Sequence, residues 1–177
     1  MKTISSSILQ LYSKLHKKES IVNFNTALTS AKSVLIFMPE KVEDFSAAKN
    51  FLRKFKQELP GKKVVICTQQ QEINIEKNSH IDGIIFVTSD DVNFFGLPRK
   101  KLTQKIAATN FDMILDLNQD FQPVSSYLSR KSNAPLKVCL YNQQKEAFYN
   151  FAYRTSVQFN LEEQYNRLVH FLGRCVQ

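Results

Sequence analysis

The sequence predicts one three-layer α/β domain with a mostly parallel sheet of about five strands. Five short runs are apolar at nearly every position, as in strands that helices cover on both faces. Segments with helical spacing separate most of these runs, so each strand returns parallel to the one before it. The 177 residues are enough for a single substantial core and too few for two catalytic domains.

A leading segment precedes the predicted sheet. Residues 5–18 place Ile8 and Leu11 at helical spacing behind a serine-rich start that can supply an N-cap, which predicts a short helix. We therefore divide the chain into an N-terminal helical appendage, residues 1–30, and a core domain, residues 31–177.

The first predicted strand and helix open the core domain. Residues 33–38 form a continuous apolar run that ends before Pro39. Residues 44–59 then repeat large apolar side chains at helical intervals, with a basic opposite face, and Pro60-Gly61 stops the helix.

The remaining elements follow the same alternation. Residues 63–67 and 83–87 are short apolar strands on either side of a polar stretch, and Leu102 and Ile106 give the stripe of a helix. That helix spans residues 98–109, the last two strands are residues 111–117 and 136–140, and the helix between them is residues 121–129. This order predicts a Rossmann-like domain.

An aromatic run follows the last predicted strand. Large aromatic side chains are usually buried in a core or an interface, so we assign the run there rather than to a cofactor site. It comprises Phe148, Tyr149, Phe151 and Tyr153, with Tyr141 nearby.

Motif content excludes several kinds of site. Three cysteines stand far apart without CxxC spacing, and the chain has three His, so neither a zinc site nor a disulfide framework is predicted. The four glycines form neither GxGxxG nor GxxxxGK, the loops that cradle nucleotide phosphates. We expect no metal and no cofactor.

Charge and hydropathy indicate a cytoplasmic protein with an affinity for anions. The 24 Lys and Arg exceed the 16 Asp and Glu and leave a formal charge of +8. No apolar run reaches the roughly 20 residues that a membrane span needs, and the N-terminal apolar patch is too short for a signal peptide. We expect a cytoplasmic location, with peripheral contact to a membrane surface left open.

Short motifs along the chain match a known enzyme family. Residues 34–38 form an apolar strand, Glu43-Asp44 follows in a loop, and a helix of the form ALxxLxxxxPG leads to Pro60-Gly61. Residues 111–117 are similar to the strand motif yDlvlDlq, and residues 161–173 to the segment that joins the family's two domains. Together they resemble the N-terminal, acceptor-side half of GT-B glycosyltransferases of the heptosyltransferase type, glycosyltransferase family nine.

The resemblance implies an isolated half of such an enzyme. The family's second half, which binds the nucleotide sugar, has no counterpart here, and Glu43 replaces the Gly that precedes the loop aspartate. We therefore expect a non-catalytic binding or interaction module of a small bacterial family, with an anionic or carbohydrate-like ligand, a protein partner or a second copy of itself. The alternative is a sugar transferase that a partner chain completes. A third reading, RNA or polyanion binding, is not favoured.

The position of Asp44 is compatible with two roles, a general base and a helix N-cap. By resemblance it matches the family's general base, which takes the proton of the acceptor hydroxyl, and a neighbouring carboxylate such as Glu43 can raise the pKa of such a base. It also stands directly before an apolar-periodic helix, where Asp is a favoured N-cap. The capping role is the simpler of the two.

Polar residues stand at the carboxyl ends of two other predicted strands. Ser89 and Asp90 follow the third strand, and Asp116 and Asn118 follow the fourth. Ligands of open α/β sheets bind at the carboxyl edge of the strands, so these four residues and Glu43 are candidate ligand contacts. Formation of turns and caps is the alternative.

A basic cluster marks the predicted helix at residues 98–109. Such a cluster can hold the phosphates of a lipid, a polyanion or RNA, and a solvated helix face explains it equally well. The candidate anion contacts are Arg99, Lys100, Lys101 and Lys105, beside Phe94 and Phe95.

Overall fold

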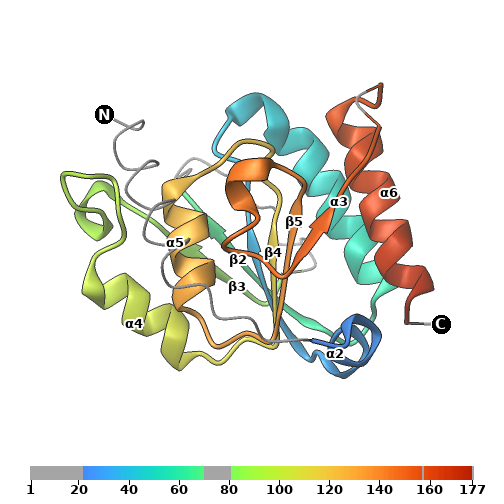
Figure 1. Cartoon of the computed structure of the whole chain (residues 1–177), viewed down its shortest axis with the longest axis horizontal. Coiled ribbons are helices and arrows are strands. Elements are labelled where there is room, and N and C mark those ends of the chain that lie inside the picture. Colours follow the sequence, from blue (N-terminus) through green and yellow to red (C-terminus); the bar gives the residue numbers. More distant parts are fainter. Residues whose placement is uncertain (1–21, 70–80, 157, 177) are drawn as a thin grey trace.

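Six parallel strands form one central sheet in the computed structural model, which describes residues 22–69, 81–156 and 158–176 (Figure 1). Their spatial order is β3-β2-β1-β4-β5-β6, and every neighbouring pair is parallel. The strands are β1 (Ser33–Phe37), β2 (Lys63–Thr68), β3 (Gly83–Phe86), β4 (Met113–Asp116), β5 (Leu136–Leu140) and β6 (Phe151–Tyr153).

Helices cover both faces of the sheet and complete the three predicted layers (Figure 1). One face packs against α2 (Phe24–Ser30), α3 (Phe45–Glu58) and α6 (Leu161–Arg174). The other face packs against α4 (Lys100–Ala108) and α5 (Pro123–Lys131). The predicted α/β class and Rossmann-like architecture are confirmed.

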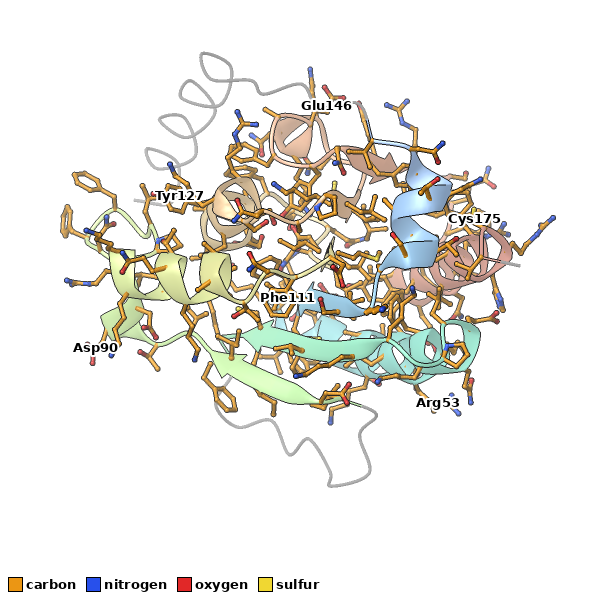
Figure 2. The ribbon with its side chains drawn as sticks, turned by 90° about the horizontal axis from the view of Figure 1, so that it is seen from below. Arg53, Asp90, Phe111, Tyr127, Glu146 and Cys175 are labelled. Carbon is orange, nitrogen blue, oxygen red and sulfur yellow. The ribbon has the colours of Figure 1, made fainter. Side chains whose placement is uncertain are left out.

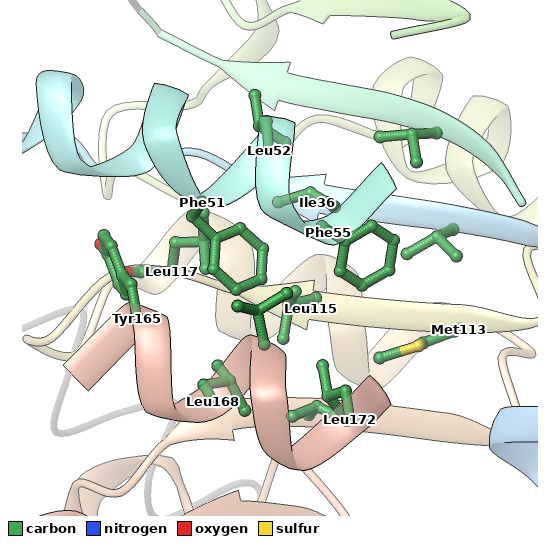
Figure 3. Packing of buried hydrophobic residues seen from close by; sticks show 14 of the residues in the cluster. Ile36, Phe51, Leu52, Phe55, Met113, Leu115, Leu117, Tyr165, Leu168 and Leu172 are labelled. Carbon is green, nitrogen blue, oxygen red and sulfur yellow. The ribbon is translucent and has the colours of Figure 1, made fainter. Parts of the chain in front are cut away.

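The central strands are apolar on both sides because each side has its own core. Val34 and Ile36 of β1 are fully buried toward α3 and α6, whereas Leu35 is buried toward α4 and α5. On the first face, Phe51 and Phe55 of α3 reach across β4 toward α6 (Figure 3). This double burial explains the continuous apolar runs in the sequence.

Two elements differ from the prediction. The sheet has six strands rather than about five, because β6 lies inside the aromatic run that we assigned to a core or interface. β6 has three residues, none of them fully buried, so it has neither the length nor the pattern of a buried strand. The helix α2 was also not predicted separately, and the predicted helix at residues 5–18 lies outside the described residues.

The buried Lys62, which directly precedes β2, donates hydrogen bonds to carbonyl groups at the C-terminal end of α2. The Lys62 side chain is 6% exposed, and its Nζ donates to the carbonyl oxygens of Leu28, at 2.8 Å, and Ala31, at 2.6 Å. These carbonyls end the helix, where a cation also complements the helix dipole. Burial lowers the pKa of Lys62, yet the paired carbonyls give its ammonium group a defined place.

None of the helices in the described ranges combines the length and the apolar character required to cross a bilayer.

Close packing of α3 against α6 depends on Gly173. A Cβ atom at this position would lie 2.6 Å from Oε2 of Glu58 and 3.1 Å from its Cβ. The first contact involves the end of a flexible side chain, but the second involves an atom fixed by the α3 backbone. Any larger residue at position 173 would therefore force Glu58 and the α3 backbone to shift.

We expect Gly173→Ala to destabilise the protein, although alanine favours helices over glycine by about 1 kcal/mol. Overpacking typically costs about 1–3 kcal/mol, so the net loss in unfolding free energy should be about 1 kcal/mol. Urea unfolding measures it. In a Glu58→Ala background, which removes the closest contact, the loss should shrink, and an equal loss in both backgrounds would contradict this account.

Candidate functional site

The chain leaves the two central strands in opposite directions. The loop after β1 leads to α3 on one face of the sheet, and the loop after β4 leads to α5 on the other. Divergence of adjacent connections opens a crevice outside the carboxyl ends of the strands, where open α/β sheets bind ligands. The β1 and β4 loops border this crevice.

Three contacts hold these two loops together. Lys41 Nζ lies 2.9 Å from Oδ2 of Asp120. The backbone N–H of Glu40 donates to Oδ1 of Asn118 at 2.9 Å, and Nδ2 of Asn118 donates to the carbonyl of Met38 at 3.3 Å. Asn118 thus uses both ends of its amide to hold the β1 loop at a fixed distance.

A buried carboxylate positions Asn118. Asp116, the last residue of β4, has no exposed surface. Its Oδ1 accepts from the backbone N–H of Asn118, at 3.0 Å, and from Nδ2, at 2.7 Å. Its Oδ2 accepts from the Tyr149 hydroxyl at 2.6 Å and from Oγ of Ser125 at 3.1 Å.

Lys145 supplies the opposite charge. It is fully buried, its Nζ lies 3.2 Å from Oδ2 of Asp116, and it donates to the carbonyl of Asn118. A buried charge is tolerated when it is paired and its polar atoms are hydrogen-bonded, as here. Asp116 was a candidate ligand contact, but in this structure its oxygens face protein donors and its role is to hold the edge of the sheet.

Two adjacent hollows follow this edge, and we call them together the crevice. A cavity of about 20 Å³, enough for one water molecule, lies between the β1 and β4 loops. Beside it a wider hollow of about 280 Å³ extends to Phe94 and Phe95, and the two share four lining residues. Polar lining comes from Glu40, Thr68, Gln69, Asn93, Asn118, Gln122 and Ser125.

Gln122 presents an available amide to both hollows. It occupies the N-cap position of α5 but makes no side-chain capping hydrogen bond. Its backbone carbonyl accepts from the N–H of Ser126, so the backbone is held while the side chain is not used by the helix. Sequence reasoning missed Gln122 because a glutamine before a proline carries no motif.

Asp44 stands at the N-cap position of α3 without acting as a cap. Its side chain makes no capping hydrogen bond, which corrects the capping role that its position suggested. Burial raises the pKa of Asp44, and the carboxylates of Glu43 and Asp120 raise it further, while Lys41 opposes the shift. Asp44 is half-buried and lies beside the crevice rather than in its lining.

The other candidate residues lie elsewhere. Ser89 and Asp90 are exposed on a short 3₁₀ turn after β3 and are not among the residues that line the crevice. Next to them, Thr88 and Asp91 form a capping box. The four basic candidates, Arg99, Lys100, Lys101 and Lys105, are all exposed on or before α4. The structure therefore brings Asn118 to the crevice, buries Asp116 behind it and leaves Glu43 and Asp44 beside it. Ser89, Asp90 and the four basic candidates are not in its lining.

In the described part of the chain, no group of three or more His, Cys, Asp or Glu side chains could hold a metal ion.

Comparison with known proteins gives a family and a fold. A family model described as "Family of unknown function (DUF6913)" matches residues 5–174. No curated protein matches the chain.

Three solved structures share the fold. A glycosyl transferase family 9 structure from Veillonella parvula has a TM-score of 0.63 at 18% identity, covering 80% of this chain and 41% of that one. E. coli heptosyltransferase WaaC with ADP has a TM-score of 0.62 at 19% identity, covering 78% and 46%. The same enzyme with ADP-2-deoxy-2-fluoro heptose scores 0.59 at 18% identity, covering 78% and 47%. The chain thus spans less than half the length of these enzymes, and the likeness is one of fold.

We expect Lys145→Met to destabilise the protein by about 3–5 kcal/mol, because it leaves Asp116 buried without its counter-charge. Denaturant unfolding measures the loss. Adding Asp116→Asn should recover part of it, since the hydroxyls of Tyr149 and Ser125 can turn to accept from the new amide. A loss below about 1 kcal/mol, the value of an exposed ion pair, would show that the pair does not hold the edge.

Proposed function

We propose that this chain, which belongs to DUF6913, a family of unknown function, is a binding module whose crevice between β1 and β4 holds a hydroxyl-rich, carbohydrate-like ligand. The observation that carries the proposal is the lining of the crevice. Its polar groups are amides, hydroxyls and a carboxylate, set among apolar walls at the switch point of the sheet.

The charge around the crevice favours a neutral ligand over an anion. Four carboxylates, those of Glu40, Glu43, Asp44 and Asp120, stand on the β1 and β4 loops against the single cation Lys41. Carboxylates accept hydrogen bonds from hydroxyl groups and repel phosphates. Among the described residues of these two loops, the net charge is therefore negative.

The size of the crevice fits one or two sugar rings. The wider hollow, of about 280 Å³, stands at the lower end of the roughly 300–1,000 Å³ typical of small-molecule sites. Amide side chains both donate and accept, so Gln69 and Gln122 can meet the alternating donors and acceptors of a sugar. The structural likeness to glycosyl transferase family 9 enzymes supports a carbohydrate ligand by analogy of fold.

Asp44 supports sugar transfer as a second candidate function. Its oxygens are free of the capping bond and its pKa is raised, which suits a general base. A base must reach the hydroxyl that it deprotonates, and Asp44 lies beside the crevice rather than in its lining. We therefore place binding first and transfer second.

We expect neutral saccharides to bind in the crevice. In an NMR titration with glucose, mannose and N-acetylglucosamine, the side-chain amides of Gln69, Gln122 and Asn118 should shift. Glucose 6-phosphate should bind more weakly than glucose because of the surrounding carboxylates. Gln122→Ala should weaken binding about fivefold, the value of one hydrogen bond of about 1 kcal/mol.

The matched control is Gln57→Ala, which removes an exposed amide from α3. It should leave saccharide binding unchanged. Absence of any shift in the crevice, or an equal effect of both substitutions, would refute the binding proposal.

We expect Asp44→Asn to leave stability unchanged or slightly raised at pH 7. Because its pKa is raised on folding, the folded state binds the proton more tightly than the unfolded state, so stability falls as the pH rises through the pKa of Asp44. Asparagine removes that loss, and its advantage should vanish at about pH 3, where Asp is protonated in both states.

Asp91→Asn is the control of opposite sign. A backbone hydrogen bond from Thr88 lowers the pKa of Asp91, so this variant should lose stability at pH 7. If the purified chain transfers sugar from an ADP-linked donor and Asp44→Asn abolishes that transfer while stability is kept, sugar transfer replaces binding as the function.

A further inference from the structure

We infer that the segment from Val92 to Lys105 docks on a bilayer that contains anionic lipids. The segment joins an aromatic hairpin, residues 92–98, to the basic start of α4. It lies at the α4 end of the molecule, away from α6 (Figure 1). The inference does not rest on the ligand proposed for the crevice, although Phe94 and Phe95 also line the wider hollow.

The aromatic hairpin is a firmly built turn. Val92 and Pro98 form an antiparallel bridge that closes it. Oδ1 of Asn93 accepts from the N–H groups of Phe95, at 2.9 Å, and Leu97, at 3.1 Å, and the N–H of Gly96 donates to the Asn93 carbonyl at 2.8 Å. Gly96 has a φ of +72°, the left-handed conformation that ends a three-residue hairpin loop.

Two phenylalanines occupy the corners of this turn. Corner positions usually hold Pro, Asp, Asn, Ser or Gly, because they project into water. Phe94 is 76% exposed and Phe95 is 54% exposed, with ring centroids 5.6 Å apart in an edge-to-face pair. The turn geometry comes from Asn93 and Gly96, so the turn itself does not require aromatic residues at its apex.

The start of α4 departs from the usual helix pattern in the same way. Its first turn has no acidic residue, and Arg99 at the N-cap makes no capping hydrogen bond. Lys100 and Lys101 instead add positive charge at the end where the helix dipole is already positive. Neighbouring departures from local sequence preferences are typical of functional surfaces.

Arg99 connects the two features. Its backbone N–H donates to the carbonyl of Asp91 at 2.7 Å, and its Nε donates to the carbonyl of Val92, at the base of the hairpin, at 3.0 Å. The cations therefore stand just behind the aromatic apex. Because the hairpin is already ordered, docking would cost little conformational entropy.

The layers of a membrane surface match the positions of the cations and the aromatic rings. Lipid phosphates attract the cations, and the hydrocarbon boundary directly beneath them accepts the rings. Single-stranded RNA would instead need ring faces spaced along a positively charged groove, whereas here two rings pack on each other at one apex. We therefore commit to a lipid bilayer as the partner.

The test uses the full chain with vesicles of phosphatidylcholine, with and without phosphatidylglycerol. The chain has no tryptophan, so Phe94→Trp gives a single reporter. We expect its emission to shift to the blue and to be quenched by brominated lipid, only with the anionic vesicles. Binding should fall steeply as salt shortens the Debye length from about 10 Å at 0.1 M to about 3 Å at 1 M.

Two double variants separate the contributions. Phe94→Ser with Phe95→Ser should weaken co-sedimentation with anionic vesicles at least about tenfold, because two large apolar side chains no longer enter the interface. Lys100→Gln with Lys101→Gln should weaken it about 25-fold, or about fivefold for each cation. All four positions are exposed, so thermal unfolding should stay unchanged.

The matched control is Lys49→Gln with Arg53→Gln, which removes the same charge from the exposed face of α3. Arg53 lies at the opposite end of the molecule from Asp90, which precedes the hairpin (Figure 2). This variant should bind within about twofold of the unchanged chain. The inference would be overturned by an equal loss in the control, by binding without the blue shift, or by no binding to vesicles. It would also be overturned if a labelled RNA oligonucleotide bound through Phe94 and Phe95 while vesicles did not.

Discussion

The buried pair of Asp116 and Lys145 is the constraint on which the carboxyl edge of the sheet depends. A buried ion pair is tolerated when its own polar atoms are hydrogen-bonded. Asp116 meets this condition through Tyr149, Ser125 and Asn118, so one carboxylate joins the end of β4 to α5 and to the loop after β5. Asn118, held in this way, fixes the β1 loop in turn. The crevice keeps its width because Asn118, which lines it, is held from both sides.

The layers could be predicted from the sequence because a strand buried on both faces is apolar at nearly every position, and a helix buried on one face is apolar at helical intervals. β1 and β4 are apolar at nearly every position, and α3 repeats its large side chains at helical spacing. β6 has no such apolar pattern. Its three residues are placed by neighbours, among them Asn150, whose Oδ1 accepts from the backbone of Lys137 in β5. Pairing of that kind is decided by tertiary contacts, which no local pattern encodes.

The candidate site could be predicted only in part, for a related reason. Polar residues that directly follow an apolar strand single out Asp116 and Asn118, but whether they face a ligand or the interior depends on Lys145. That lysine reaches them from a loop after β5, and its sequence context is that of an ordinary surface residue. The exposure of Phe94 likewise follows from the turn that Asn93 and Gly96 build, which composition does not reveal.

The lysine that completes α2 imposes an order of assembly on the chain. Lys62 lies 34 residues after Leu28, so during synthesis the end of α2 emerges from the ribosome well before the ammonium group that satisfies it. A helix of seven residues is too short to persist alone in water. α2 therefore becomes stable only after β2 has settled beside β1 and Lys62 reaches the carbonyls of Leu28 and Ala31.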